Sequence, residues 1–251
     1  MRVAVLADIH GNSWALGRVL RDVERRRVDR LLDLGDSLYG PLDPRGTFRL
    51  IRSSGLTSLA GNEDRLIVER GGAGPTLRFV REELDEEAAA WLRSLPRTRI
   101  LDGVAFMCHG TPRSDTTYLL ERVRDGGLSV KTPGLIEALL RGVGPRLVFC
   151  GHSHVPRLIE TPHRLVLNPG SVGCPAYDDD RPSYHRVENH SGLAHYAVVE
   201  IDGGAAMVER ISLPYASAAA AERASRNGRP DWAHWLLSGR VSGARSGRRA
   251  A

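Results

Sequence analysis

The 251-residue sequence has few of the features on which several protein classes depend. It has only three cysteines, Cys108, Cys150 and Cys174, and this odd, widely spaced set does not fit a disulfide-stapled secreted domain. No apolar run reaches about 18 residues, so no membrane-spanning helix is expected. Strand-like residues follow Met1 directly and leave no space for a signal peptide. We therefore expect a cytoplasmic protein whose strand-ending cysteines, Cys108 and Cys150, are buried small hydrophobes.

Lysine is nearly absent, with Lys131 alone among 35 basic residues, which we interpret as coding bias. The net charge of +5 includes four arginines in the segment Gly239–Ala251, and removing them leaves +1 for the rest of the chain. Nucleic acid is therefore not an expected partner. We predict one domain over residues 1–238 and a disordered basic tail over 239–251. Weak polyanion binding by that tail is an alternative.

Strand-like and helix-like patterns alternate along the first part of the chain, which is typical of an α/β protein with parallel strands. Later, short strands dominate, with Gly203-Gly204 as a hairpin signal. The polar segment Gly173–Gly192 is a candidate active-site loop. The predicted strands are Arg2–Ala7, Arg30–Leu34, Leu56–Ala60, Val104–Cys108, Arg146–Cys150, Arg164–Asn168, His195–Asp202 and Ala205–Leu213. The predicted helices are 14–23, Arg45–Ser53, Glu82–Leu95, Pro133–Arg141, Tyr215–Asn227 and Pro230–Leu237.

Five polar clusters follow predicted strands at their carboxyl ends. In α/β proteins these ends meet at one crevice, so the clusters are expected to converge. They supply two aspartates, one asparagine and four histidines, a mixed nitrogen and oxygen set that favours ions such as Mn²⁺, with Fe, Ni or Zn as alternatives. The clusters are Asp8-Ile9-His10, Gly35-Asp36, Gly61-Asn62, His109-Gly110 and Gly151-His152-Ser153-His154.

Seven ligands suit two divalent metal ions rather than one. Two ions about 3.5–4 Å apart can hold a bridging hydroxide and clamp a phosphoryl group during displacement. Taken singly, each cluster also has an ordinary structural explanation, because Gly-Asp is a common turn and a histidine ending an apolar strand is often a core residue. The ordered set of five therefore carries the prediction.

This ordered set resembles the motifs of the calcineurin-like metallophosphoesterase superfamily. The run Asn168-Pro169-Gly170-Ser171-Val172-Gly173 further resembles the compact bacterial branch with the YfcE-type phosphodiesterases. The resemblance implies an α/β/β/α sandwich of two mixed sheets and places Asn12 near the substrate phosphate. It also implies two overlapping ligand sets that share one aspartate: Asp8, His10, Asp36 and His154 for the first metal, and Asp36, Asn62, His109 and His152 for the second.

One position departs from the family pattern, because Glu63 follows Gly61-Asn62 where the family usually has a catalytic histidine. Glu63 could act as a general acid if burial raised its pKa, although nearby cations oppose that shift; the alternative is a carboxylate that supports a ligand or lies in solvent. His185 and His190 are candidate substitutes for the acid. Arg113 and Arg181 are candidate substrate-anion contacts. The run Asp178-Asp179-Asp180 is interpreted as turn chemistry.

The expected function is therefore a binuclear metal-dependent phosphoesterase in which a metal-bridging hydroxide attacks phosphorus, with small phosphoesters, including nucleotides, as substrates. Phosphodiesterase activity is preferred because the compact branch favours it. A phosphomonoesterase on the same site and a non-catalytic scaffold are the alternatives. Trp91, Trp232 and Trp235 are expected in the core, and Trp14 under the first helix or at the edge of the site.

Overall fold

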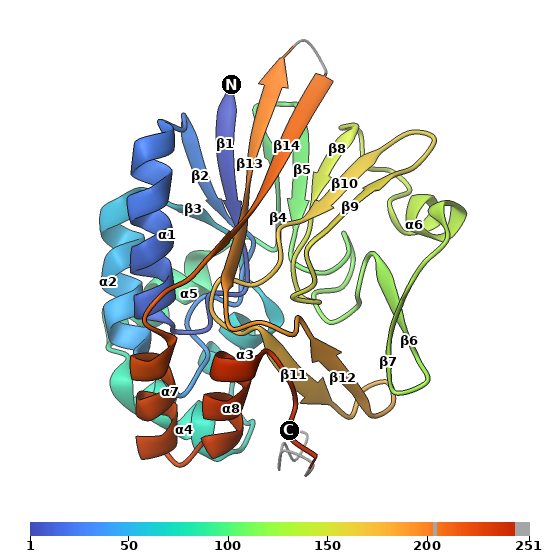
Figure 1. Cartoon of the computed structure of the whole chain (residues 1–251). Coiled ribbons are helices and arrows are strands. Elements are labelled where there is room, and N and C mark those ends of the chain that lie inside the picture. The colour runs from blue at the N-terminus through green and yellow to red at the C-terminus, as the bar shows by residue number, and fades with distance from the viewer. Residues whose placement is uncertain (203–204, 244–251) are drawn as a thin grey trace.

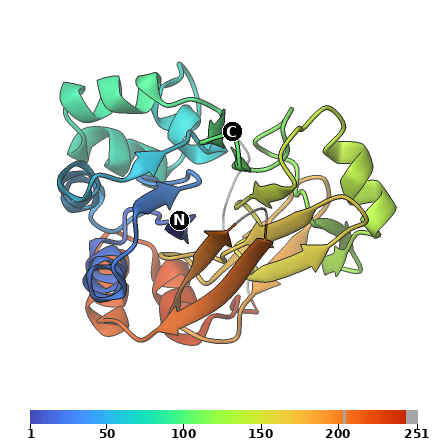
Figure 2. The ribbon, with the colours of Figure 1, turned by 90° about the horizontal axis from the view of Figure 1, so that it is seen from above.

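The computed structural model describes residues 1–202 and 205–243. Two five-stranded mixed sheets lie between helical layers (Figures 1 and 2). One sheet has the order β14-β13-β1-β2-β3 and the other β4-β5-β8-β10-β9, so the expected α/β/β/α sandwich is confirmed. Seen from above, α1 and α2 cover one side and α6 covers the other (Figure 2). None of the described helices is long and apolar enough to cross a bilayer.

The elements have the following bounds. The strands are β1 Arg2–Leu6, β2 Arg30–Asp33, β3 Thr57–Ser58, β4 Thr98–Leu101, β5 Ala105–Cys108, β6 Glu121–Arg124, β7 Gly127–Val130, β8 Leu147–Phe149, β9 Arg157–Glu160, β10 Leu165–Asn168, β11 Ala176–Asp179, β12 His185–Glu188, β13 Ala194–Asp202 and β14 Ala205–Leu213. The helices are α1 Ser13–Arg26, α2 Pro44–Ser54, α3 Asn62–Val68, α4 Pro75–Glu83, α5 Glu86–Ser94, α6 Pro133–Leu139, α7 Ser217–Arg226 and α8 Pro230–Ser238.

β1 is an inner strand that is buried on both faces. It pairs parallel with β2, as in Val3↔Arg30, and antiparallel with β13, as in Arg2↔Glu200. Val3 and Val5 face the core between the sheets, whereas the alternate residues Ala4 and Leu6 face α1 and α2. This double burial explains why the strand is continuously apolar.

The second sheet packs on the first through the same core. β8 lies between β5 and β10 and is parallel to both. Met107, Phe149 and Leu167 point from these three strands into the core between the sheets. Their neighbours Phe106, Val148 and Val166 point the other way, toward α6. β1, β5 and β8 therefore end in the interior of the sandwich, and the polar residues after them meet there.

Two predicted elements are wrong in detail. The helix expected over Glu82–Leu95 is two helices, because Leu84 is extended and the Asp85 side chain accepts the Ala88 N–H to begin α5. The segment Gly173–Gly192 is not a plain loop, since it contains the β11–β12 hairpin. The sequence patterns also missed α3, α4 and the strands β4, β6, β7 and β9, all of which are short.

The predicted Gly203-Gly204 hairpin and the predicted basic tail over 239–251 are each described only in part. β13 and β14 pair antiparallel as far as Asp202↔Ala205, while Gly203-Gly204 lie outside the described residues. Gly239 ends α8 in the left-handed region, and Val241 is buried and donates its N–H to Glu188. The first residues of the predicted tail thus pack against the domain, and residues 244–251 lie outside the described part.

Candidate metal centre

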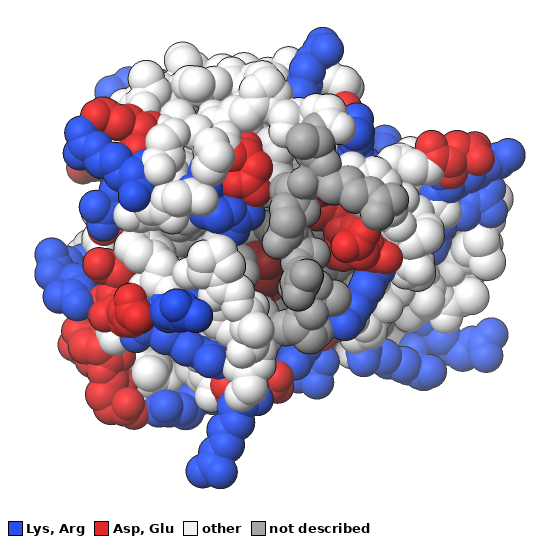
Figure 3. Space-filling model, turned by 90° about the horizontal axis from the view of Figure 1, so that it is seen from below, with Lys and Arg blue, Asp and Glu red and all other residues white. Residues whose placement is uncertain are grey.

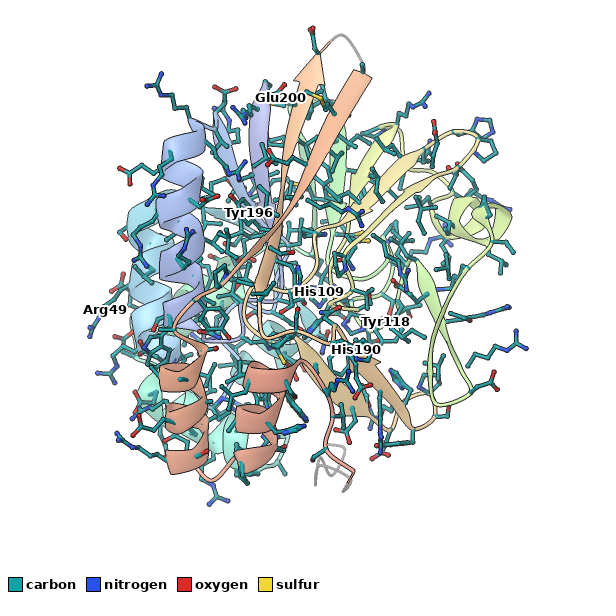
Figure 4. The ribbon with its side chains drawn as sticks, viewed as in Figure 1. Arg49, His109, Tyr118, His190, Tyr196 and Glu200 are labelled. Atoms are coloured by element: carbon teal, nitrogen blue, oxygen red, sulfur yellow. The ribbon has the colours of Figure 1, made fainter. Side chains whose placement is uncertain are left out.

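The seven predicted ligands come together beneath the carboxyl ends of the strands, with Asn62 beside His109 and with His109 between the two sheets in Figure 4. Asp8, His10 and Asp36 can offer ligand atoms within 4.8 Å of one another, and so can Asp36, His109 and His152. His154 joins the first group through His10, whose Nε2 lies 3.0 Å from its own Nε2. Most of these side chains are buried, while His152 and Asn62 keep partial exposure. The centre therefore opens to solvent on the side of α3.

The backbone at five of the ligands is left-handed, a conformation that is uncommon outside glycine. The φ angle is 56° at Asp8, 52° at His10, 55° at Asp36, 69° at His152 and 58° at His154. Such positions cost of order 1–3 kcal/mol each and persist where the surroundings enforce them. Loop-to-loop bonds provide that enforcement, as in the N–H of Asp8 to the Gly35 carbonyl at 3.0 Å. Concentration of strained residues at one place is the pattern expected of a functional site.

Three of the histidines are oriented by backbone carbonyls. Nδ1 of His10 lies 2.9 Å from the Tyr39 oxygen, Nδ1 of His109 lies 3.0 Å from the Leu34 oxygen, and Nδ1 of His154 lies 2.7 Å from the Cys174 oxygen. Because a carbonyl can only accept, each Nδ1 carries a proton. Each Nε2 therefore faces the centre, in the arrangement of metal-binding histidines whose other nitrogen is held by an outer partner.

Acceptor atoms face one another at the middle of the centre. The Nε2 atoms of His10 and His154 are 3.0 Å apart, and Nε2 of His109 lies 3.2 Å from an oxygen of Asp36. Such contacts are unfavourable unless a proton or a cation lies between the acceptors. The donor set and its directions therefore fit two divalent cations.

The shifted pKa values indicate which ligand side chains can carry protons in place of cations. Burial disfavours charge on His10 and His109, but hydrogen bonds and attraction to Glu63 and Asp36 outweigh it, raising the pKa of His10 to about 9 and that of His109 to about 10. Burial, aided by the charge on His109, lowers the pKa of His152 to about 3. Burial raises the pKa of Asp8 to about 7. Two imidazoles thus hold the positive charge that cations would supply.

Glu63 lies beside the first group of ligands. Its Oε2 is 3.2 Å from Nδ1 of His10, and its backbone N–H donates to Oδ1 of Asp36 at 2.8 Å. The adjacent Asp64 is buried and accepts backbone N–H groups of Gly61 and Ser37. Asp64 thus fixes the start of α3, and Glu63 faces His10 from that fixed position.

Asn12, expected near the substrate phosphate, is fully buried with both amide atoms engaged. Its oxygen accepts the Ala15 N–H at 3.0 Å and so begins α1. Its nitrogen donates to the Gly173 carbonyl at 3.0 Å and to the Tyr215 hydroxyl at 3.2 Å. The structure thus places Asn12 as a link between the first ligand loop and the Gly170–Gly173 turn.

The histidines proposed as substitute acids lie outside the ligand cluster. His185 is buried in β12, and its Nδ1 donates to the Ser183 carbonyl at 2.9 Å. Its Nε2 therefore accepts the hydroxyl of Tyr118 at 2.7 Å, and the Tyr118 ring lies 4.8 Å from the His152 ring. His190 is exposed and lies just after β12 (Figure 4). His185 thus reaches the centre only through Tyr118.

The other predicted contacts are peripheral. Arg113 and Arg181 are exposed, on the loop after β5 and on the β11–β12 turn respectively. Asp179 accepts the backbone N–H of Arg181 at 2.9 Å, in keeping with turn chemistry for the Asp178–Asp180 run. The face of the molecule in Figure 3 carries basic and acidic side chains intermixed over its described part.

The sequence patterns missed several residues that shape the centre. Trp232 is buried as expected, but its ring also lies edge-on to His10 at 5.8 Å. Tyr177 packs on His154 at 4.6 Å and donates to the His152 carbonyl at 3.2 Å. The buried Asp115 accepts two bonds from Arg65 of α3 and so ties α3 to the loop after β5. No sequence motif marks these residues, because their roles depend on long-range packing.

The Asn168–Gly173 motif cross-links the two halves of the centre. Asn168 donates to the Gly151 carbonyl at 2.9 Å and to Ser153 Oγ at 3.0 Å, and Ser171 donates to the Asp8 carbonyl at 2.7 Å. A Cβ on Gly173 would lie 1.7 Å from the Ile9 carbonyl oxygen, so only glycine fits there. The motif is thus a clamp rather than a source of ligands.

Comparison with known proteins agrees with this geometry. Residues 1–192 match the family model described as the calcineurin-like phosphoesterase superfamily domain. A metallophosphoesterase structure from Sphaerobacter thermophilus is 25% identical with a TM-score of 0.74, covering 95% of this chain and 100% of its own. The hypothetical protein PH1004 from Pyrococcus horikoshii OT3 is 22% identical with a TM-score of 0.72, covering 96% and 99%. The uncharacterized protein MJ0912 from Methanocaldococcus jannaschii is 24% identical over 72% of this chain and 80% of its own length.

Proposed function

The chain belongs to the calcineurin-like phosphoesterase superfamily, and from this premise we propose that it is a binuclear metal-dependent phosphoesterase that prefers phosphodiesters. The observation that carries the proposal is the inward convergence of acceptor atoms, above all the 3.0 Å contact between Nε2 of His10 and Nε2 of His154. A buried core built for stability alone would pair acceptors with donors. The Nδ1 atoms of His10 and His154 already donate to backbone carbonyls. Only a bound cation or an additional proton can therefore satisfy the two Nε2 atoms that face each other.

The ligands divide into two groups that share Asp36. Asp8, His10 and His154 would hold the first ion with it, and Asn62, His109 and His152 would hold the second. Bound divalent ions supply Lewis-acid activation of water and neutralise phosphoryl charge. The protein residues fix the donor directions in advance, because carbonyls hold the imidazoles and backbone N–H groups hold the carboxylates. Mn²⁺ is the proposed ion, with Fe, Ni and Zn as alternatives.

Several finer assignments belong to this proposal. The Asn168–Gly173 clamp supports membership of the compact bacterial branch with YfcE-type phosphodiesterases. The substrates would be small phosphoesters, including nucleotides. The intermixed charges in Figure 3 agree with a small substrate rather than nucleic acid. The burial of all three cysteine thiols agrees with a cytoplasmic location.

Hydrolysis of bis(p-nitrophenyl) phosphate by the metal-free protein supplemented with Mn²⁺, Fe²⁺, Ni²⁺ or Zn²⁺ tests the proposal directly. We expect a metal-dependent rate that falls by at least about a hundredfold in Asp36→Asn, because that carboxylate serves both ligand groups. An exposed carboxylate variant such as Glu87→Gln is the control, since its side chain is 72% exposed. Absence of both metal uptake and turnover would refute the proposal.

The same metal-free protein supplemented with metal distinguishes two alternative functions. A phosphomonoesterase would hydrolyse p-nitrophenyl phosphate faster than the diester at equal metal loading. A non-catalytic scaffold is motivated by the loss of the family histidine at position 63. It would bind metal without turning over either compound, and Asp36→Asn would change its metal content but no rate.

A further inference from the structure

Glu63 occupies the position where the family usually has its catalytic histidine, yet it contacts a metal ligand. Its Oε2 lies 3.2 Å from Nδ1 of His10, which also lies 2.9 Å from the Tyr39 carbonyl oxygen. The Nδ1 proton is donated to the Tyr39 carbonyl, and the Glu63 carboxylate lies beside it at ion-pair distance. A carboxylate in this position makes the imidazole a stronger donor through Nε2, the nitrogen that faces the centre.

The surroundings strengthen this contact. Side-chain exposure is 3% for His10 and 14% for Glu63, so solvent screens the pair only weakly. The fully buried Trp232 ring packs edge-on against His10 and keeps water from that part of the ring. The Glu63 carboxylate is therefore an effective charge at His10.

The same residue has a second, separable link to the ligands. The backbone N–H of Glu63 donates to Oδ1 of Asp36 at 2.8 Å. Substitution of the side chain leaves this backbone bond in place. A change confined to the side chain thus probes the His10 contact without removing support from Asp36.

On the basis of the proposed function, we propose that Glu63 is a positioning residue that acts through His10 to raise the cation affinity of the first ligand group, and not the general acid that replaces the family histidine. The carboxylate adds negative charge beside that group and fixes the His10 ring. Outer partners of this kind typically change metal affinity by about 10–100-fold. The leaving group receives no proton from Glu63, because its carboxylate serves His10.

The test is a metal titration by calorimetry on the metal-free full chain with Mn²⁺ and with Zn²⁺. We expect Glu63→Gln to weaken one of two binding events by about 10–100-fold and to leave the other within about twofold. Glu87→Gln is the matched control and is expected to bind as the unmodified protein does. Thermal unfolding of the metal-free variants checks that each one folds. If Glu63→Gln does not fold, Glu63→Ala serves as a second variant.

A double-mutant cycle identifies the route of the effect. If Glu63 acts through His10, Glu63→Gln has no further effect on metal affinity in a His10→Ala background. A full effect in that background would overturn the inference, because it would mean that Glu63 binds the cation directly or acts by another path. Unchanged affinities in Glu63→Gln alone would also overturn it.

The leaving group provides an independent readout. At saturating metal, a positioning role predicts that Glu63→Gln changes the rates for p-nitrophenyl and alkyl leaving groups by the same factor. An acid role predicts a much larger loss for the alkyl leaving group with metal affinity unchanged, and that result would refute the inference. Failure of the unmodified protein to bind two metals would count against the proposed function, whereas normal binding by both proteins would count against the role of Glu63 alone.

Discussion

Metal binding to this protein is expected to release about two protons at pH 8. The pKa of His10 is about 9 and that of His109 about 10, so both imidazoles are mostly protonated at that pH without metal. The pKa of Asp8 is about 7, so at pH 8 this carboxyl has already lost most of its proton. His152, with a pKa of about 3, has none to lose. Because a ligand must be deprotonated to bind, each cation pair displaces the protons of His10 and His109.

The size of the pH effect on metal affinity follows from the coupling between metal binding and proton release. Each displaced proton changes the logarithm of the overall affinity by one per pH unit, so the affinity for the metal pair rises about a hundredfold per unit between pH 7.5 and pH 8.5. Below about pH 7, Asp8 also takes up a proton and the number released approaches three. Above pH 10 the slope falls toward zero, because both imidazoles then lose their extra protons.

Calorimetric titration in buffers of different ionisation enthalpy measures the released protons directly. The protonated imidazoles also stabilise the metal-free protein, since a folded-state pKa raised above 6.5 gives stability that is complete below pH 6.5 and lost as the pH rises through 9 to 10. The rise in Tm on adding metal should therefore grow from pH 6.5 to pH 9. Release of less than about half a proton at pH 8, or an affinity independent of pH, would refute the reasoning.

Three further outcomes are expected from the packing around the centre. Gly173→Ala should lower the free energy of unfolding by about 3 kcal/mol or prevent folding, because the added Cβ would meet backbone atoms. The control Gly134→Ala should be neutral or stabilising in denaturant unfolding, because the space around Gly134 is open. Asp115→Asn should weaken the second metal-binding event by about tenfold, because the carboxylate that holds Arg65 of α3 is lost. An equal loss of affinity at both binding events in a metal titration would argue against this role. His185→Gln should change the diesterase rate by less than about tenfold while lowering Tm, because the residue is buried behind Tyr118; a loss of activity above a hundredfold would restore it as an acid.

Local sequence patterns predicted most of the long elements. The alternation and length of the apolar runs located β1, β2, α1, α2 and the β13–β14 pair, because continuous burial leaves a continuous apolar signal. The predicted helix over Glu82–Leu95 failed where the Asp85 side chain captured a backbone N–H and began a new helix. The β11–β12 hairpin was missed because its strands are short and rich in polar residues, and its buried residues Ala176, Tyr177 and Val187 pack with α7 and α8 rather than in the main core.

For the candidate site, the sequence by itself determined which side chains are available and that they follow strands, since strand ends and ligand types are both local properties. Only the tertiary structure decided what those side chains do. The 3.0 Å contact between His10 and His154 joins residues 144 positions apart, and the carbonyls that orient each imidazole come from other loops. The contact between Glu63 and His10 likewise exists only because α3 packs beside the first ligand loop. Directions of donors and acceptors depend on such long-range packing, which no local pattern encodes.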